Sequence, residues 1–305
     1  MIYDVIIIGG GPAGLTAAIY TARARRSTLM ICQGFPGGQI MQADVIENYP
    51  GFPDGISGIE LGSAFYAQAE RFGLETVYAT ATGISVSGGV RTVTTDSGDK
   101  YTARALILAT GASPRRLNVP GEAELGGKGV SYCATCDGAL FKGKKVAVIG
   151  GGDTAAGESV FLTRFAAEVH LFHRRDRLRA AGILQERLFA SSVTVHWNQR
   201  PAEILGEDRV KGIRLRDTVT GDDSVFECDG VFVLAGTAPN SEAFCKTVAC
   251  DESGYVIANS AAETSVPGIF SAGDVNHDAF RQVATAIGDG ARAAHAADIY
   301  LEKSE

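Results

Sequence analysis

The sequence predicts an α/β protein that contains two structural units of the same kind. Each unit opens with a β-branched run, a glycine-rich turn and an alanine-rich helix, at residues 5–25 and again at 146–165. Continuous apolar runs of this type form parallel strands that are buried on both faces of a sheet. Each unit also ends in a buried strand and a similar loop, TGASP at 110–114 and GTAPN at 236–240. The repeat favours two Rossmann-like domains with three layers each (ββα).

The first glycine-rich turn, residues 9–14, has the spacing Gly-x-Gly-x-x-Gly between a strand and a helix. In this context the glycines form a tight turn, let the backbone approach a pyrophosphate and allow close helix packing. The pyrophosphate then lies at the N-terminus of the helix. The second strand, 28–32, is followed by Gln33, where such sites usually have an acidic residue that binds a ribose. Gln33 or a backbone group would have to make that contact.

The rest of the first unit alternates loops with regular elements. Apolar spacing predicts one amphipathic helix, and residue alternation predicts a small antiparallel meander. Pro114 and Pro120 indicate a linker, so we expect a domain boundary near 115–120. The elements expected before it are a glycine-rich loop at 34–39, an aromatic loop at 47–53, the helix at 59–72, the meander at 80–104 and a buried strand at 105–109.

The run CATCDG, residues 133–138, carries two cysteines three positions apart. Cys133 and Cys136 can form a disulfide on one turn of a helix expected over 133–141. A cysteine in the first turn of a helix is favoured as thiolate, and Asp137 is placed to exchange a proton with the dithiol. The alternatives are a structural bridge and half of a zinc site. The zinc site would need a second ligand pair, and the sequence has no other Cys-x-x-Cys or close His pair.

The second glycine-rich turn, residues 150–155, has the spacing Gly-x-Gly-x-x-Ala and begins 141 positions after Gly9. The strand expected at 168–172 is followed by cations instead of an acidic residue. Guanidinium groups bind phosphate through charge-assisted hydrogen bonds, and two of them favour a 2′-phosphate by roughly 100-fold or more. The second site is therefore predicted to bind NADPH. The cations are His173, Arg174, Arg175 and Arg179.

The C-terminal part is expected to complete both units. Asp274 is the C-terminal residue of a strand expected at 267–274, so it is placed to hydrogen-bond a sugar or ribityl hydroxyl of a cofactor. Cys32, Cys228, Cys245 and Cys250 are interpreted as packing residues. The other expected elements are a small sheet from 193–197, 210–216 and 224–228, a buried strand at 230–235, a short strand at 254–258 and a closing helix at 282–301.

Composition excludes some classes of function. The net charge of −7 argues against nucleic acid as the main ligand. No run of 18 apolar residues and no charged leader with a cleavage site is present. We therefore expect neither secretion nor a membrane span, and a cytoplasmic location, where a close cysteine pair is more often catalytic than structural.

In this order, the motifs resemble those of the low-molecular-weight thioredoxin reductases, flavoproteins of the pyridine-nucleotide disulfide oxidoreductase superfamily. The resemblance covers essentially the whole chain. It implies FAD in the first site, NADPH in the second, and a homodimer. It also implies an FAD domain formed by residues 1–116 and 245–305, with the NADPH domain, 117–244, inserted between them. The motifs are GGGPAG (9–14), GGQ (37–39), ENYPG (47–51), ATGA (109–112), CATCDG (133–138), GGGDTA (150–155), HRR (173–175), AGDV (272–275) and RQ (281–282).

The resemblance assigns roles to individual residues. The catalytic residues are Cys133, Cys136, nearer the flavin, and Asp137, the proton donor and acceptor. The FAD-binding residues are Gly9, Gly11, Pro12, Ala13, Gly14, Gly37, Gly38, Gln39, Asn48, Thr110, Gly111, Asp274, Arg281, Gln282 and Val283. The NADPH-binding residues are Gly150, Gly152, Asp153, Thr154, His173, Arg174, Arg175 and Arg179.

The implied reaction passes two electrons from NADPH to FAD, to the Cys133–Cys136 disulfide and then to thioredoxin. The cysteine pair belongs to the NADPH domain but must reach the flavin and then an external protein. We therefore expect the inserted domain to rotate about linkers near 115–120 and 240–246. Alternative acceptors are another thioredoxin-like protein and a small-molecule disulfide. A nucleotide-binding redox sensor without enzymatic activity is the alternative from a different class.

Overall fold

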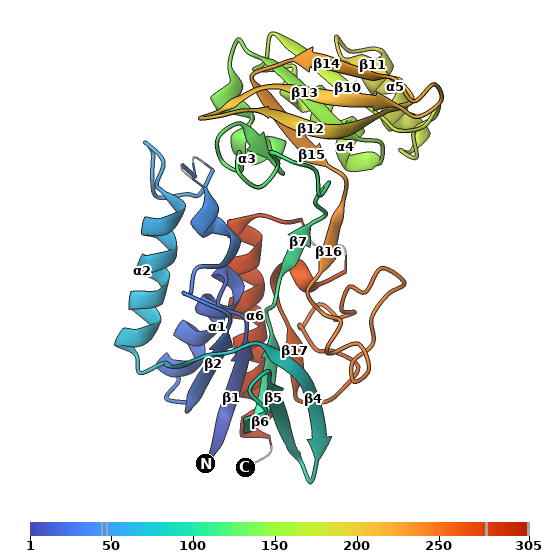
Figure 1. Cartoon of the computed structure of the whole chain (residues 1–305). Coiled ribbons are helices and arrows are strands. Elements are labelled where there is room, and N and C mark those ends of the chain that lie inside the picture. The colour runs from blue at the N-terminus through green and yellow to red at the C-terminus, as the bar shows by residue number, and fades with distance from the viewer. Residues whose placement is uncertain (44, 47, 278–279, 304–305) are drawn as a thin grey trace. The chain divides into compact units, whose positions relative to one another are not determined.

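The computed structural model describes residues 1–43, 45–46, 48–277 and 280–303. The chain divides into two compact units, one formed by residues 1–113 and 238–305 and the other by residues 114–237. The first unit is thus discontinuous in sequence, and the second is inserted into it. Both are α/β units, as predicted (Figure 1).

The first unit is built on a seven-stranded sheet with the order β3-β2-β1-β6-β5-β4, in which β17 also pairs with β6. Its strands are β1 (Ile2–Ile8), β2 (Thr28–Cys32), β3 (Glu75–Tyr78), β4 (Ala81–Ser87), β5 (Val90–Thr95), β6 (Lys100–Leu108) and β17 (Ile269–Ser271). Its helices and 3₁₀ turns are α1 (Pro12–Arg23), η1 (Gly38–Gln42), α2 (Gly58–Arg71), η3 (Gly273–Val275) and α6 (Val283–Glu302).

Strand β6 pairs with strands from both sequence segments of the first unit. Its first half pairs with β5 in the expected antiparallel meander. Its last three residues pair in parallel with β17, which arrives from the C-terminal segment. Helix α6 then packs beside α1 (Figure 1), and a Cβ at Gly290 would collide with the carbonyl of Ala13. Glycine at this position permits the close approach of the two helices.

Alternate residues of the parallel strands enter different cores of the first unit. Val5 and Ile7 pack with the side chains of α1, α2 and α6. Ile6 and Ile8 pack on the opposite face with Val93 and with the loop segment after residue 240. Because successive side chains of a strand point to opposite faces, an apolar strand at the centre must be covered on both sides.

The second unit contains a five-stranded parallel sheet with the order β11-β10-β9-β15-β8 and a three-stranded antiparallel sheet with the order β12-β13-β14. Its strands are β8 (Val130–Ser131), β9 (Lys145–Gly150), β10 (Glu168–Phe172), β11 (Thr194–His196), β12 (Gln199–Gly206), β13 (Val210–Asp217), β14 (Asp223–Glu227) and β15 (Gly230–Leu234). Its helices are α3 (Ala134–Asp137), η2 (Gly138–Phe141), α4 (Asp153–Leu162) and α5 (Gly182–Phe189). The segments at the unit limits, β7 (Ala112–Pro114) and β16 (Thr237–Pro239), pair with each other.

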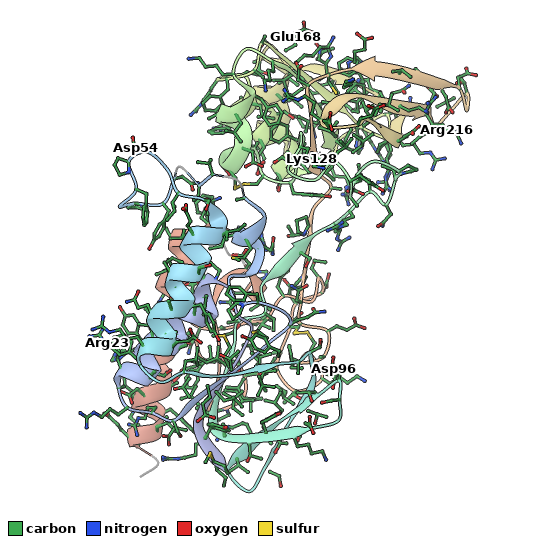
Figure 2. All side chains as sticks on the ribbon, turned by 60° about the vertical axis from the view of Figure 1, so that its left-hand side comes forward. Arg23, Asp54, Asp96, Lys128, Glu168 and Arg216 are labelled. Carbon is green, nitrogen blue, oxygen red and sulfur yellow. A yellow bond between two sulfur atoms is a disulfide. The ribbon has the colours of Figure 1, made fainter. Side chains whose placement is uncertain are left out.

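The parallel sheet of the second unit lies between two cores. Val146 and Val148 of β9 pack against helices α3 to α5. Ala147 and Ile149 pack against the antiparallel sheet, where they contact the cluster that contains Ile213. This produces the predicted three-layer ββα arrangement. Glu168 and Arg216, labelled in Figure 2, form ion pairs of 3.3 Å with Lys145 and 2.6 Å with Asp223. Such exposed pairs contribute little stability compared with the cores.

Three expected elements differ from the structure. The segment expected at 193–197 forms β11 of the parallel sheet, and β12, which the sequence did not predict, takes its place beside β13. Strand β12 contains Pro201 and an irregular register between Pro201 and Glu203, so it lacks a clean alternation. The strand expected at 254–258 is reduced to isolated bridges of Val256. The helix expected over 133–141 is split into α3 and η2.

Candidate functional site

The Cys133–Cys136 pair forms a disulfide at the start of α3, with Cα atoms 5.3 Å apart. Cys133 is the N-cap residue, and its Sγ accepts a hydrogen bond from the backbone N–H of Cys136 (3.2 Å). Cys133 is half-buried and Cys136 is exposed. An N–H that points at sulfur stabilises negative charge on that sulfur, so the reduced pair favours a thiolate at Cys133.

Two carboxyl groups hold the backbone around this disulfide. Asp137 accepts a hydrogen bond from the hydroxyl of Ser131 (2.6 Å), and the same hydroxyl oxygen accepts the N–H of Cys133 (3.2 Å). Glu158 of α4 accepts the N–H of Ala134 (2.7 Å). Burial raises the pKa of Glu158 above its ordinary value, and the hydrogen bond from Ala134 opposes the rise. Asp137 is thus connected through the hydroxyl of Ser131 to the backbone of Cys133, next to the pair.

The first glycine turn leaves an open cradle at the start of α1. A Cβ at Gly9 (φ +113°) would collide with the carbonyl of Ala109, and one at Gly14 would collide with the carbonyl of Gly9. Gly11 caps α1 in an extended conformation, and a Cβ there would approach only Gly38. The turn and the close helix contact thus need the outer glycines, whereas the middle glycine leaves space for a bound pyrophosphate. Pro12 and Ala13 follow in the first turn of α1.

Polar side chains predicted to bind FAD make contacts between distant segments of the first unit. The amide of Asn48 donates to Gln282 (2.9 Å), and the amide of Gln39 donates to the carbonyl of Ala112. The hydroxyl of Thr110 is buried and has no hydrogen-bond partner among the described residues. A buried hydroxyl without a protein partner fits a site whose ligand supplies the missing hydrogen bond. Gly37, Gly38 and Gly111 all have positive φ, and Val283 begins α6.

Asp274 and Arg281 form the charged part of the same region. Burial raises the pKa of Asp274 to about 6; the positive charge of Arg281 opposes the rise and the negative charge of Asp289 adds to it. The Nε of Arg281 is buried without a hydrogen-bond partner among the described residues, and its guanidinium carbon lies 4.7 Å from the ring centre of Tyr255. A desolvated carboxyl fits the hydroxyl groups of a sugar or ribityl chain, which would donate to it.

Gln33, the residue in the position of the usual acid, is exposed at the end of β2. Its neighbour Cys32 is buried, which raises the pKa of the thiol to about 11 and keeps it neutral. A ribose contact in the first unit therefore remains a prediction for Gln33 or the backbone.

The second glycine turn repeats the cradle at the start of α4. A Cβ at Gly150 would collide with the carbonyl of Leu234, and one at Gly151 would collide with the ring of His173. Gly152 caps α4 in an extended conformation with open space where a Cβ would be. Asp153 accepts the N–H of Ala181 (2.7 Å), which ties the start of α4 to the loop before α5, and Thr154 follows it in the first turn.

The four basic residues predicted to bind NADPH divide into one buried histidine and three exposed arginines. His173 is buried, with Nδ1 2.7 Å from the carbonyl of Gly150 and Nε2 without a partner among the described residues. Arg174, Arg175 and Arg179 are exposed, and their side chains make no ion pair within the described parts of the chain. The backbone N–H of Arg179 donates to Gly151 (2.7 Å), which holds this arginine beside the turn. Three uncompensated guanidinium groups beside an open cradle fit a phosphorylated nucleotide.

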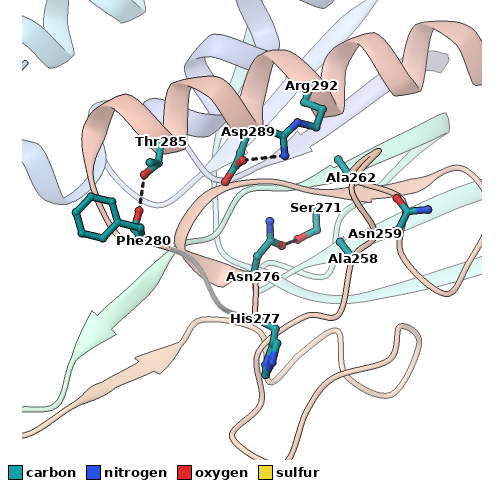
Figure 3. Close-up of a pocket in the computed structure, with 10 residues that line it drawn as sticks. All are labelled: Ala258, Asn259, Ala262, Ser271, Asn276, His277, Phe280, Thr285, Asp289 and Arg292. Atoms are coloured by element: carbon teal, nitrogen blue, oxygen red, sulfur yellow. Dashed lines mark hydrogen bonds and ion pairs between the residues drawn. The ribbon is translucent and has the colours of Figure 1, made fainter. Parts of the chain in front are cut away.

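A polar cavity of about 260 Å³ lies elsewhere in the first unit (Figure 3). It contains the Asp289–Arg292 ion pair (3.5 Å) and the hydroxyl of Ser271, which donates to Asn276. None of the predicted FAD-binding residues lines it, but the lining residue Asp289 acts through its charge on Asp274. Its lining residues are Ala258, Asn259, Ala262, Ser271, Asn276, His277, Phe280, Thr285, Asp289 and Arg292.

The second disulfide and two contacts near the Cys133–Cys136 pair were not predicted from the sequence. Cys245 and Cys250, interpreted as packing residues, form a second disulfide, so that interpretation is wrong. Cys32 and Cys228 are free and buried. Ser131 and Glu158 were not predicted to support the catalytic pair. Glu158 could have been noticed as a carboxyl in a glycine- and alanine-rich helix turn, but its partner Ala134 is 24 positions away in sequence.

Comparison with known families gives a match over most of the chain. Residues 3–290 match the sequence profile of the pyridine nucleotide-disulphide oxidoreductase family. The chain is 49% identical to the thioredoxin reductase of Bacillus subtilis (strain 168) over 99% of its own length and 96% of the relative. It is 44% identical to the thioredoxin reductase of Streptomyces clavuligerus, over 98% and 94% of the two chains.

Solved structures are similar over the same extent. The thioredoxin reductase of Streptococcus pyogenes MGAS5005 is 43% identical, with a TM-score of 0.93 and 99% of each chain covered. The Lactococcus lactis thioredoxin reductase in its FR conformation is 42% identical, with a TM-score of 0.69 and the same coverage.

Proposed function

Because the chain belongs to the pyridine nucleotide-disulphide oxidoreductase family, we propose that it is an NADPH-dependent flavoprotein that reduces the disulfide of thioredoxin. The observation that carries this function is the Cys133–Cys136 disulfide with Asp137 beside it, in a chain similar to thioredoxin reductases over its full length. The enzyme uses FAD and NADPH. Bound FAD supplies a two-electron acceptor between the nicotinamide and the disulfide.

The two glycine cradles are proposed to hold the two cofactors. FAD is assigned to the first unit, with Gly11 at its pyrophosphate, Asp274 at its hydroxyl groups, and Thr110 and Arg281 making the hydrogen bonds that they lack within the protein. NADPH is assigned to the second unit, with Gly152 at its pyrophosphate. The remaining residues predicted for each cofactor belong to the same proposal, as do the domain limits 1–116 with 245–305 and 117–244.

The cysteine pair is proposed to carry the electrons to thioredoxin. Two electrons and two protons convert the Cys133–Cys136 disulfide to two thiols, and Asp137 exchanges one of these protons. The thiolate favoured at Cys133 then attacks the thioredoxin disulfide and forms a mixed disulfide. The thiol of Cys136 resolves it, so that thioredoxin leaves as a dithiol and the enzyme disulfide is restored.

The inserted unit is proposed to change its orientation during this cycle. The unit limits fall at 113/114 and 237/238, so only two chain segments connect the units. Solved relatives of nearly equal identity differ widely in TM-score, which supports more than one arrangement of the domains in this family. A disulfide engineered across the two units should slow turnover, and unchanged single-turnover and steady-state rates would contradict the proposal.

A homodimer and a cytoplasmic location are proposed from the family alone. None of the described helices combines the length and the apolar character needed to cross a lipid bilayer. Sedimentation of the holoenzyme tests the first proposal, because a monomer mass at micromolar concentration would contradict it. Cell fractionation tests the second.

Anaerobic flavin spectroscopy tests the function itself. We expect the yellow holoenzyme to bleach with NADPH but not with NADH, and to regain its absorbance when oxidised thioredoxin is added. Bleaching without recovery would indicate a different acceptor, such as another thioredoxin-like protein or a small disulfide. Cys136→Ser should keep FAD bound and reducible while turnover of thioredoxin stops. Turnover by this variant would contradict the assigned role of the pair.

A further inference from the structure

The second disulfide, Cys245–Cys250, has no part in the reaction proposed above. Its Cα atoms lie 5.5 Å apart in the first unit, and both cysteines are partly exposed. We propose that this pair is a reversible thiol–disulfide switch that is reduced by the thioredoxin the enzyme produces, and whose reduction weakens FAD binding. The inference rests on the proposed function, because that function supplies the reductant.

The position of this disulfide argues against a role limited to stabilising the fold. The bridge joins residues only five positions apart. The stabilisation that a disulfide provides through loop closure is smallest for short loops. Reduced thioredoxin is formed at this enzyme, so a partly exposed disulfide on the same chain is always within reach of a protein dithiol. A bridge in this setting is suited to report the redox state of thioredoxin.

The exchange step balances without another reactant. A thioredoxin thiolate attacks one sulfur of the pair, forms a mixed disulfide and releases the other cysteine as a thiolate, which takes up a proton. The second thioredoxin thiol then displaces the bound cysteine, which also ends as a thiol. Thioredoxin leaves oxidised, Cys245 and Cys250 are left reduced, and NADPH is the ultimate source of the two electrons.

Both ends of the bridge contact the same turn, residues 251–255. Cys250 precedes Asp251, whose carboxylate accepts the backbone N–H groups of Ser253 (2.8 Å) and Tyr255 (2.9 Å). The Sγ of Cys245 lies 3.5 Å from the carbonyl oxygen of Gly254, and this oxygen accepts a hydrogen bond from the hydroxyl of Ser241. The disulfide therefore fixes this turn from two sides.

The same turn supports the charged wall of the proposed FAD site. The ring of Tyr255 lies under the guanidinium group of Arg281 (4.7 Å), and Arg281 lowers the energy of the ionised carboxyl of Asp274. Asp251 also pairs with Nδ1 of His277 (2.6 Å), three positions after Asp274. Opening the bridge frees one covalent anchor of this turn, so Arg281 loses part of the support that places it beside Asp274.

The test uses a Cys133→Ser/Cys136→Ser background, in which the second pair is the only disulfide among the described residues. The holoenzyme is mixed with thioredoxin that has been pre-reduced with dithiothreitol and freed from it. Alkylation and mass spectrometry of the peptide around residues 245–250 should show two modified thiols. The dissociation constant of FAD, measured by fluorescence, should rise about fivefold, a typical size for coupling between two sites. The additional substitutions Cys245→Ser/Cys250→Ser should give the raised dissociation constant of FAD before thioredoxin is added, and reduced thioredoxin should not change it.

Cys228→Ala, which removes a buried free thiol from the second unit, serves as the matched control and should leave the switch unchanged. A pair that stays oxidised in excess reduced thioredoxin overturns the proposal, as does reduction with an unchanged dissociation constant for FAD. A separate arm uses the wild-type enzyme with NADPH and oxidised thioredoxin. If the pair is reduced by pre-reduced thioredoxin but not in this arm, the proposed function has failed and the switch stands.

Discussion

The two glycine turns are built alike, but the residues that follow each unit's second strand differ. In both turns the middle glycine, Gly11 or Gly152, caps a helix and leaves open space, while the neighbouring glycines face backbone or ring atoms. After β2 the first unit places the neutral Gln33, whereas after β10 the second unit places Arg174 and Arg175. If the cofactors bind as proposed, the backbone of each turn receives the pyrophosphate and side chains outside the turn select the nucleotide.

The units also differ in what completes the site. The proposed site of the first unit includes Asp274 and Arg281 from the C-terminal segment, and burial raises the pKa of Asp274 while the Nε of Arg281 is buried. The second unit instead presents the exposed guanidinium groups of Arg174, Arg175 and Arg179. We therefore expect a tightly held cofactor in the first unit and an exchanging nucleotide in the second.

The largest expected effect comes from Gly9→Ala. The new Cβ collides with the carbonyl of Ala109, and the alanine must adopt a backbone φ of +113°, which disfavours residues with a side chain. The free energy of unfolding should therefore fall by about 3 kcal/mol, and the enzyme should lose FAD. Thermal unfolding and flavin absorbance measure both. Gly83→Ala, at a position with open space and no positive φ, is the control. A Gly9→Ala variant with unchanged FAD content and stability would show that the first turn does not require glycine at this position.

Nucleotide selection by the second unit is tested by Arg174→Ala combined with Arg175→Ala. The KM for NADPH should rise roughly 100-fold, because two charge-assisted contacts to the 2′-phosphate are lost, while the KM for NADH stays constant. Steady-state kinetics with both nucleotides provide the measurement. Arg177→Ala, an exposed arginine of the same turn, is the matched control. An equal rise in the KM for NADPH and for NADH would contradict the assignment of these arginines to the 2′-phosphate.

The pH dependence of FAD binding tests the buried carboxyl of the first unit. Without FAD, burial raises the pKa of Asp274 from 3.8 to about 6, because the folded protein favours the neutral carboxyl. The contribution of this carboxyl to folding stability is therefore complete below pH 3.8 and is lost as the pH rises through about 6. Hydroxyl groups of FAD should donate to the ionised form. The affinity of the protein for FAD should therefore fall about tenfold when the pH is lowered from 7 to 5. Fluorescence titration checks this, and Asp274→Asn should remove the dependence; an identical slope in that variant would refute the assignment.

Gly152→Ala should have the smallest effect. Nothing lies within 4 Å of the new Cβ, so the free energy of unfolding should change by less than about 0.5 kcal/mol. The KM for NADPH should rise roughly fivefold, because the methyl group enters the space for the pyrophosphate. Kinetics and thermal unfolding together separate the two effects. A large loss of stability would show that the open space has a structural role.

Local pattern was sufficient to predict the elements around both cradles. The apolar runs of β1, β2, β9 and β15 and the glycine spacing are local signals, and the structure places them as expected. The C-terminal strand β17 was also expected, within the longer run 267–274, but it ends at Ser271 and Asp274 lies in the following turn η3.

Features that depend on contacts between distant residues could not be predicted in this way. Strand β12 lacks alternation because of the irregular register near Pro201, and its position is decided by pairing with β13. The bond between Cys245 and Cys250 depends on how the loop folds over Gly254, which the spacing of two cysteines does not reveal. The contact of Glu158 with Ala134 needs α4 and α3 to be packed together.

The insertion of the second unit has a consequence for synthesis on the ribosome. When residue 113 has been made, the sheet edge that β17 will cover and the face of α1 that α6 will cover are both still open. The 124 residues from 114 to 237 must be translated before that material arrives. At ~5–20 residues per second this takes about 6–25 s. The nascent first unit therefore carries an unprotected apolar edge for seconds. During most of this time the second unit is also incomplete, because its inner strand β15 ends only at Leu234. This interval is the natural point for chaperone binding.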